Sequence, residues 1–315
     1  MRAYVIRRCL QSIVVINIVL VIVFMMLHMS GSPGDVLMPE DSSLEDIEEF
    51  NKAHGFDQPL HIQYYRFIFG FDNGVVRSKG VIFGDFGYSY RHELPAHELV
   101  FEHFPATIDL ALTAVVISIL VAIPAGVLSA TFRNTWIDYV SSIGSMFGQS
   151  MPNFWLGLML IIFFSVYLDL FPSSGYESPI YIVLPALTAG LYQTARITRV
   201  VRAGMLEVLG SEYITTARSK GIVEWIVIMR HALKNAAIPV VTLIGLELGV
   251  LLGGTVVTEV IFAWPGVGFL VIDAINNQDY PIVQAAVTLL ATIFVFINLI
   301  VDLIYAWLDP RIAYS

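Results

Sequence analysis

Cysteine and charge are both scarce in this sequence. Cys9 is the only cysteine among 315 residues, which excludes an intrachain disulfide, a cysteine-based zinc site and an iron–sulfur cluster. Only 14% of the residues are charged, whereas soluble domains have about 25%. The formal net charge is −9. An acidic balance disfavours a nucleic-acid-binding protein, because such proteins present basic surfaces.

Sequence motifs for common catalytic chemistries are also missing. The chain has no Gly-x4-Gly-Lys-Ser/Thr phosphate loop, no His-Glu-x2-His zinc helix and no Gly-x-Ser-x-Gly elbow. We therefore assign no catalytic residue and no metal ligand. His92, His97 and His103 lie near glutamates, but Pro95 interrupts the helical spacing. A solvated acidic face is the better interpretation of these histidines.

Apolar residues are abundant and fall in long runs. They make up 57% of the chain, and runs of about 20 apolar residues are long enough to cross a bilayer. The pattern predicts an all-α membrane protein with six transmembrane helices, at residues 9–29, 104–130, 136–168, 180–198, 236–262 and 282–307. The third run is long enough to be tilted or broken, with break points at Gly144, Gly148 and Pro152.

The basic residues are distributed unevenly between the predicted spans. Twelve of the 17 lysines and arginines fall on the side that holds both termini. The remaining five lie in the first connection, which is too long to follow the positive-inside rule. Both termini are therefore predicted to be cytoplasmic. The first apolar run is too long for a cleaved signal, and we interpret it as a retained signal anchor.

The first connection is predicted to be an ordered segment outside the cell. It carries twelve acidic residues between Asp35 and Glu98. Ser42 and Glu45 have the spacing of a capping box, and Gly55 is placed to end the helix that follows. Aromatic residues 64–71 suit a segment at the membrane interface.

Four carboxylates lie in or near the predicted spans: Asp109, Glu247, Glu259 and Asp302. Asp109 and Asp302 lie near span ends, where solvated or capping roles are expected. A carboxylate inside the bilayer costs about 2.5–3.5 kcal/mol on insertion scales, so such a residue usually has a function. Glu247 and Glu259, the latter near the outer end of its span, are therefore candidates for a translocation path. A purely structural hydrogen bond from Glu247 to a neighbouring helix is the alternative.

A row of small residues lies on the opposite side of the fifth predicted span. Gly245, Gly249 and Gly253 repeat every four residues, a spacing that lets another helix approach closely. Glu247 is two residues from Gly245, about 200° around a helix. We expect the glycine row to pack on a helix and the glutamate to face a cavity or a second partner.

The connection between the fourth and fifth spans is the longest cytoplasmic segment. Residues 212–220 predict a short helix that ends at Gly221. Ile214 and Ala217 form a small apolar ridge among charged residues, which suggests docking in a groove of another protein. A basic helix held to anionic lipid headgroups is the alternative.

This segment carries a recognisable motif. Thr215-Thr216-Ala217-x3-Gly221, followed by His231-Ala232-Leu233-x-Asn235-Ala236-x2-Pro239, resembles the cytoplasmic signature of permeases from bacterial binding-protein-dependent ABC importers of the dipeptide/oligopeptide/nickel family. The general form of that signature is Glu-Ala-Ala-x3-Gly. Thr215 replaces the glutamate, as is typical of peptide-type permeases.

Further motifs extend the resemblance along nearly the whole chain. They are Pro33-Gly34-Asp35, Gly55-Phe56-Asp57-Gln58-Pro59-Leu60 with Gln63-Tyr64, Gly84-Asp85-Phe86-Gly87-Tyr88-Ser89, Pro105-Ala106-Thr107, Pro152-x2-Trp155, Phe171-Pro172-x2-Gly175, Glu259-x4-Trp264-Pro265-Gly266-x-Gly268 and Asp279-Tyr280-Pro281. Val36 stands where the family often has proline. The start close to Arg7-Arg8 is similar to the first, B-type permease of the pair that such systems encode.

The resemblance implies a fold and a set of partners. The fold is that of type I ABC importer permeases, with residues 1–29 as tail and first helix, 30–103 as a periplasmic connection and 104–315 as the permease core. The implied partners are a second homologous permease, two ABC ATPases, a periplasmic or lipid-anchored solute-binding protein and the lipid bilayer of the bacterial inner membrane. The chain itself would bind no cofactor, since the ATPases would use ATP and magnesium.

The resemblance also implies roles for particular residues. A coupling helix within the loop at residues 199–235 would seat in the ATPase through Glu212, Tyr213, Thr215, Thr216, Ala217, Arg218, Lys220 and Gly221. The outer segment with Trp264, Asp279 and Tyr280 would contact the solute-binding protein.

Function then follows as an expectation. The leading hypothesis is a non-catalytic permease subunit for di- and oligopeptides, with nickel complexes, glutathione or other small solutes as substrates also known in the family. A proton-coupled secondary transporter that uses Glu247 and Asp109 is the alternative from another class. A membrane-embedded hydrolase lacks a paired nucleophile and base in the spans.

Overall fold

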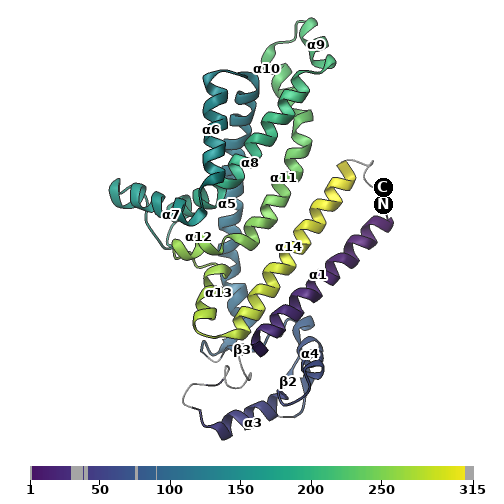
Figure 1. The fold of residues 1–315 in the computed structure, drawn as a ribbon, viewed down its shortest axis with the longest axis vertical. Coiled ribbons are helices and arrows are strands. Elements are labelled where there is room, and N and C mark those ends of the chain that lie inside the picture. Colours follow the sequence, from purple (N-terminus) through teal and green to yellow (C-terminus); the bar gives the residue numbers. More distant parts are fainter. Residues whose placement is uncertain (1, 30–37, 39–41, 75–76, 90, 309–315) are drawn as a thin grey trace. The chain divides into compact units, whose positions relative to one another are not determined.

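The computed structural model describes residues 2–29, 38, 42–74, 77–89 and 91–308 (Figure 1). The motif at residues 33–36 and the basic residue Arg311 lie outside the described residues. The chain forms two compact units. Unit 1 comprises Met1–Val5, Ile108–Trp264 and Ile297–Ser315, and unit 2 comprises Ile6–Thr107 and Pro265–Phe296.

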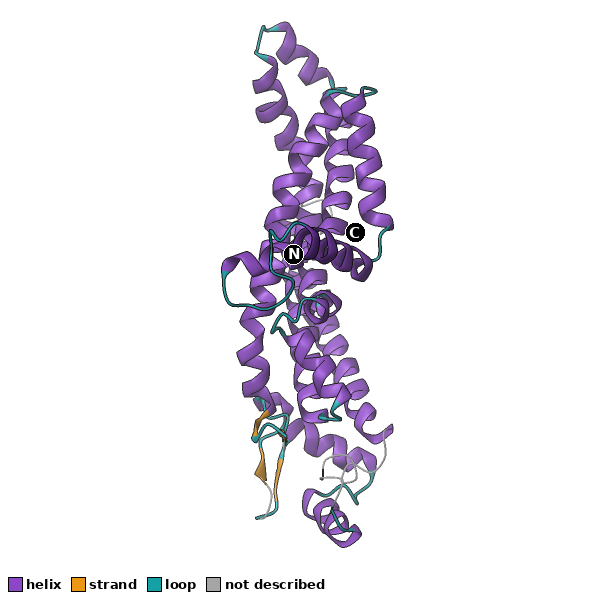
Figure 2. Cartoon of the chain, turned by 90° about the vertical axis from the view of Figure 1, so that its left-hand side faces the viewer, coloured by secondary structure: helices purple, strands orange, loops and turns teal. Residues whose placement is uncertain are grey.

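Unit 2 contains short elements between longer helices. Along the chain these are most of α1 (Arg2–Met29), α3 (Leu44–His54), α4 (Leu60–Phe69), β1 (Phe71–Asp72), β2 (Arg77–Ser78), η1 (Val81–Phe83), β3 (Tyr88–Ser89), β4 (Leu94–Pro95), the start of α5 (Ala96–Thr131), α13 (Val267–Asn276) and the first half of α14 (Tyr280–Leu308). Both strand pairs are antiparallel, with Phe71 opposite Ser78 and Tyr88 opposite Pro95. Figure 2 shows these short strands beside the helices.

Helix α3 corrects one local prediction. Its N-cap is Ser43 rather than Ser42, and the capping box pairs Ser43 with Asp46 rather than Ser42 with Glu45. The backbone N–H of Asp46 donates to Ser43 Oγ at 3.2 Å, and the N–H of Ser43 donates to Asp46 Oδ2 at 3.2 Å. The Ser43 hydroxyl also donates to Asp46 Oδ2, at 2.6 Å, and this bond, together with the one from the Ser43 N–H, holds the pKa of Asp46 below its usual range. Both serines have an acid three residues later, so spacing alone did not discriminate. The predicted end at Gly55 is confirmed by its left-handed φ of 73°.

Unit 1 is built mainly of helices. In chain order these are the rest of α5, α6 (Trp136–Ser150), α7 (Asn153–Leu160), the π-helix η2 (Ile161–Tyr167), η3 (Pro179–Ile182), α8 (Val183–Leu209), α9 (Glu212–Ser219), α10 (Glu224–Ile226), the π-helix η4 (Val227–Ala232), α11 (Leu233–Gly254) and α12 (Val256–Ile261), followed by the end of α14. Helix α8 packs against both α6 and α11. Figure 1 shows α9 and α10 at the end of this bundle away from α12.

Three helices in the described part of the chain are long and apolar enough to span a membrane: Ile6–Met26, Ala96–Thr131 and Tyr280–Leu303. Two bent pairs also qualify if each counts as one span, namely Trp136–Ser150 with Asn153–Tyr167 and Glu224–Ala237 with Pro239–Gly254. Helix α8 is not among these candidates, and it carries Arg196, Arg199 and Arg202. Six spans therefore stay a prediction.

The break in the third predicted span is at one of the three expected positions. The axes of α6 and α7 differ in direction by 107°, and Pro152 lies in the break between the two helices. Gly144 and Gly148 were wrong as break points, because α6 continues through both. Gly148 has a packing role instead: a Cβ there would lie 3.3 Å from Leu191 of α8. Proline interrupts helical hydrogen bonding, whereas glycine only permits a break.

Candidate functional site

Helix α9 is short and has defined ends. Ser211 precedes it in extended conformation. The backbone N–H of Gly221 donates to the carbonyl of Arg218 at 2.9 Å, and Gly221 has a left-handed φ of 76°. The predicted helix and its end at Gly221 are confirmed. Glycine suits this position because other L-residues adopt this conformation at a cost of roughly 1–2 kcal/mol.

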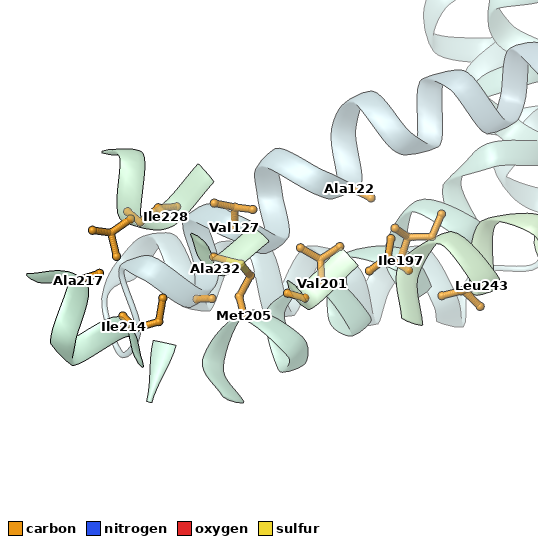
Figure 3. Close-up of a cluster of buried hydrophobic side chains, with 14 residues drawn as sticks. Ala122, Val127, Ile197, Val201, Met205, Ile214, Ala217, Ile228, Ala232 and Leu243 are labelled. Carbon is orange, nitrogen blue, oxygen red and sulfur yellow. The ribbon is translucent and has the colours of Figure 1, made fainter. Parts of the chain in front are cut away.

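The apolar ridge of α9 faces its own chain, which corrects the prediction that it docks in a partner. Ile214 and Ala217 are buried and belong to a hydrophobic cluster with Met205, Val227 and Ala232 (Figure 3). Burial of these two side chains attaches an eight-residue helix to the bundle. Ala217 therefore cannot offer a contact surface. The exposed coupling candidates are Glu212, Tyr213, Thr215, Thr216, Arg218, Lys220 and Gly221.

Two polar contacts hold α9 to the following helices. The Arg218 guanidinium binds Glu224 through both nitrogens, Nε to Oε2 at 3.1 Å and Nη2 to Oε1 at 2.6 Å. Asn235 Nδ2 donates to the Tyr213 hydroxyl at 2.7 Å and to the His231 carbonyl at 3.2 Å. Both contacts bridge the turn at Gly221. Helix α9, which carries most of the first part of the sequence motif (residues 215–221), is thus tied to the second part (residues 231–239) through Asn235.

Exposed apolar side chains lie just after this turn. Val223 is 67% exposed and Trp225 is 66% exposed. Sequence reasoning missed them, although an apolar pair within a charged segment was a usable signal. Together with the outer face of α9, they give this end of unit 1 a surface of apolar side chains among charges of both signs, and exposed aromatic residues such as Trp225 are enriched in protein interfaces.

An ion pair between the half-buried Arg202 and the buried Asp138 joins α8 to the beginning of α6. Arg202 binds Asp138 in bidentate fashion, Nε to Oδ1 at 2.7 Å and Nη2 to Oδ2 at 2.9 Å. The Ser129 hydroxyl and the Asn134 backbone N–H also donate to Asp138, at 2.6 and 3.0 Å. The sequence analysis did not identify this pair, because nothing in the spacing relates residues 64 positions apart.

A second ion pair joins α8 to α11. Arg196 Nη1 lies 2.6 Å from Glu247 Oε1. Glu247 is 1% exposed, whereas the Arg196 side chain is 46% exposed. The other oxygen, Oε2, is buried and has no hydrogen-bond partner among the described residues. Glu247 thus faces a neighbouring helix of its own chain, and one of its two carboxylate oxygens accepts no hydrogen bond from the described residues.

The three glycines of the row on α11 differ in how closely other parts of the chain approach them. A Cβ on Gly245 would lie 2.6 Å from Val301 Cγ2 of α14, so these helices are in close contact there. Gly249 is buried. No described atom lies within 4 Å of a Cβ placed on Gly253. Close helix packing within this chain is therefore limited to part of the row, and packing by Gly253 stays a prediction.

The acidic and aromatic residues after α11 are buried in unit 1. Glu259 is buried, and its Oε1 accepts a hydrogen bond from the Thr255 hydroxyl at 2.8 Å. Trp264 is also buried and packs edge-on against Tyr176, whose hydroxyl donates to Asp109 at 3.1 Å. Trp264 therefore supports its segment and offers no surface for a partner. The path role of Glu259 stays a prediction.

Two motifs of unit 2 meet although they are far apart in the sequence. The Ser89 hydroxyl donates to Asp279 Oδ2, and Ser89 Oγ accepts from the His92 backbone N–H. Asp279 is buried, so, like Trp264, it stabilises its own segment and is not available for contact with a partner. Tyr280 is half-buried, and its contact with a partner stays a prediction. No group of three His, Cys, Asp or Glu among the described residues is placed to hold a metal ion.

Comparisons with known proteins agree along the whole length of the chain. Residues 122–314 match the family "Binding-protein-dependent transport system inner membrane component", and residues 1–111 match the family of its N-terminal part. The dipeptide transport system permease protein DppB of Alkalihalophilus pseudofirmus is 37% identical over all of both chains. The glutathione transport system permease protein GsiC of Escherichia coli strain K12 is 38% identical over 99% of both chains.

Solved structures show a similar fold at lower identity. A chain of the MetNI methionine ABC transporter, in an inward-facing conformation, aligns with a TM-score of 0.55 and 19% identity over 67% of this chain and 96% of that one. A chain of an amino acid ABC transporter aligns with a TM-score of 0.52 and 17% identity over 66% and 93%.

Proposed function

The chain belongs to the family of inner membrane components of binding-protein-dependent transport systems, and we propose that within this family it serves the ATP-driven import of short peptides. It is a permease subunit of the bacterial inner membrane. The observation that carries the proposed substrate class is its full-length similarity to a dipeptide permease and to a permease for glutathione, itself a tripeptide.

The proposed assembly divides the work between chains. A second homologous permease completes the translocation path, two ABC ATPases bind and hydrolyse ATP with magnesium, and a periplasmic or lipid-anchored solute-binding protein delivers the peptide. This chain itself binds no cofactor. In this proposal it crosses the membrane six times with both termini in the cytoplasm, and the connection at residues 30–103 lies outside.

Helix α9 is proposed to transmit the movement of the ATPases. Three contacts support that role: the buried pair Ile214 and Ala217, the Arg218–Glu224 ion pair and the Tyr213–Asn235 hydrogen bond. A force applied to the outer face of α9 would reach α8 and α11 through these contacts. Transporters change access largely by such rigid-body rocking.

Reconstitution tests the proposed function. Vesicles that contain this chain, its homologous permease and the ATPases, with solute-binding protein outside, should accumulate a radiolabelled dipeptide only when ATP is inside. Omission of the ATPases should abolish uptake, and a proton ionophore should leave it unchanged. Accumulation without ATPases, or collapse with the ionophore, would favour a proton-coupled secondary transporter. No observation favours that alternative.

We predict that Glu247→Gln slows uptake severalfold while the permease complex still assembles. Glutamine can keep one hydrogen bond to Arg196 but leaves the arginine charge without its buried counter-charge. Glu207→Gln, an exposed change on α8, is the matched control. Uptake rate and yield of co-purified complex are the two measurements. Equal loss of both would show that Glu247 is structural and not part of the path.

A further inference from the structure

Several motifs in unit 2 have no role in the coupling or translocation scheme, yet they line one cavity. The cavity has a volume of about 550 Å³. Its walls come from the end of α3, from α4 and β2, from the loop at residues 83–88 and from the beginning of α14. Gly55-Phe56, Gln63, Gly84–Tyr88 and Pro281 all belong to motifs of the sequence and all line this space. Every lining residue belongs to unit 2.

Arg66 provides a positive charge in the cavity wall. Its guanidinium carbon lies 5.3 Å from the centre of the Phe71 ring. Its Nη1 occupies the space that a side chain on Gly55 would need. The Arg66 side chain makes no hydrogen bond or ion pair within the described part of the chain. The guanidinium is therefore held in place by packing while its donors stay free for an anion.

The acidic residue in the wall does not neutralise this arginine. Asp85 accepts backbone N–H groups from Lys79 at 2.8 Å and from Gly87 at 3.1 Å, which orders its own loop. The Lys79 side chain adds a second cation to the lining. His97, also in the wall, has a buried Nδ1 with no hydrogen-bond partner among the described residues. These groups favour an anionic ligand.

The rest of the wall is largely aromatic. Phe50, Phe56, Phe67 and Phe86 line the cavity together with Phe24 of α1. Pockets of about 300–1,000 Å³ with apolar walls and a few placed polar groups are typical of small-molecule sites. A diacyl lipid is too large, since each chain spans half of a hydrocarbon core of about 30 Å. The lining thus suits a small anion with an apolar body.

We propose that this cavity binds a short peptide, with the peptide's C-terminal carboxylate on Arg66 and an apolar side chain among the phenylalanine rings. The choice of a peptide over other apolar carboxylates rests on the proposed function. Since most of the lining belongs to the connection at residues 30–103, which is predicted to lie outside the membrane, the cavity would be a peptide site separate from the translocation path. The free guanidinium and the aromatic walls give it selectivity for carboxylates with bulky apolar neighbours.

Calorimetric titration of the full chain in lipid nanodiscs tests this site. The probe is L-leucyl-L-phenylalanine, and its C-terminal amide is the matched ligand without the carboxylate. We expect the acid to bind and the amide to bind at least about tenfold more weakly, since a charged hydrogen-bonded pair is lost. This comparison uses the unmodified protein, so a folding defect cannot explain it.

Variants then locate the site. Arg66→Gln should weaken binding of the acid about tenfold or more and abolish the preference over the amide, while Arg66→Lys should keep part of it. Arg91→Gln, at an exposed cation outside the cavity, should bind as the wild type does.

Three outcomes would each overturn the proposal: equal affinity for acid and amide, an unaffected Arg66→Gln variant, or a co-purified lipid that the peptide cannot displace. ATP-driven uptake without this binding would leave the proposed function intact, and binding without such uptake would refute only the proposed function.

Discussion

A Gly221→Val variant should insert into the membrane at wild-type levels and yet lose at least about tenfold of its association with the ATPase subunits and of its peptide uptake. Gly221 has a φ of 76°, and no described atom lies within 4 Å of a Cβ placed there. Space is therefore available, and the cost is conformational. A β-branched residue is a genuine outlier in this left-handed region, so the turn must rearrange.

That rearrangement would separate the groups that the turn brings together. The Arg218–Glu224 pair and the Tyr213–Asn235 hydrogen bond both bridge Gly221. Loss of either would let α9 move relative to α11 and would disorganise the proposed ATPase contact. Co-purification of the ATPases with tagged permease measures the association directly.

The control variant tests the left-handed φ of residue 221 with a side chain that tolerates it. Gly221→Asn should keep most of the association, because asparagine tolerates left-handed conformations better than other residues with a side chain. Membrane yield of both variants shows whether insertion is normal. If the valine variant retains its ATPases and its uptake, α9 with its turn is not the coupling element.

The largest effect on stability is expected at the ion pair between α6 and α8. We expect Asp138→Ala to lower the free energy of unfolding by about 1–3 kcal/mol, the range for loss of hydrogen bonds to a buried charged group, because the half-buried Arg202 that is left behind can be solvated. Asp138 accepts from Arg202, Ser129 and the Asn134 backbone, so all of these donors would lose their acceptor. Denaturant-induced unfolding of the purified chain in detergent measures the change.

Two further variants separate the ion pair from general damage to the helix. The double variant Asp138→Ala with Arg202→Ala should be less destabilised than the sum of the single variants, because no buried charge is left without a partner. Glu48→Ala, which breaks the exposed pair with Lys52, should change stability little. Additive losses at Asp138 and Arg202 would contradict a coupled pair.

Local signals in the sequence were sufficient for several features of the fold. The break at Pro152, the end of α3 at Gly55 and the end of α9 before Gly221 were all predicted. Each depends on the backbone of one residue: a missing N–H in proline, or a left-handed φ that glycine adopts freely. The one-residue error at the N-cap of α3 arose because Ser42 and Ser43 satisfy the same local rule.

The candidate site was only partly predictable, for a reason that Ile214 and Ala217 illustrate. Their spacing showed that they share a helix face, but not whether that face meets a partner or the protein's own core. The core of unit 1 already presents Met205, Val227 and Ala232 to α9, so the ridge is buried within the chain. The same limit applies to Trp264 and Asp279, which were expected on a surface and are buried.

The sequence by itself determined the class of protein, most helix positions and the family, because apolar run length, helix-ending residues and short motifs are properties of neighbouring residues. Only the tertiary structure decided which charges pair, which face of α9 is exposed and that Ser89 meets Asp279 across 190 positions. Such contacts depend on how helices pack in three dimensions, and packing brings together residues that carry no mark of each other in the chain.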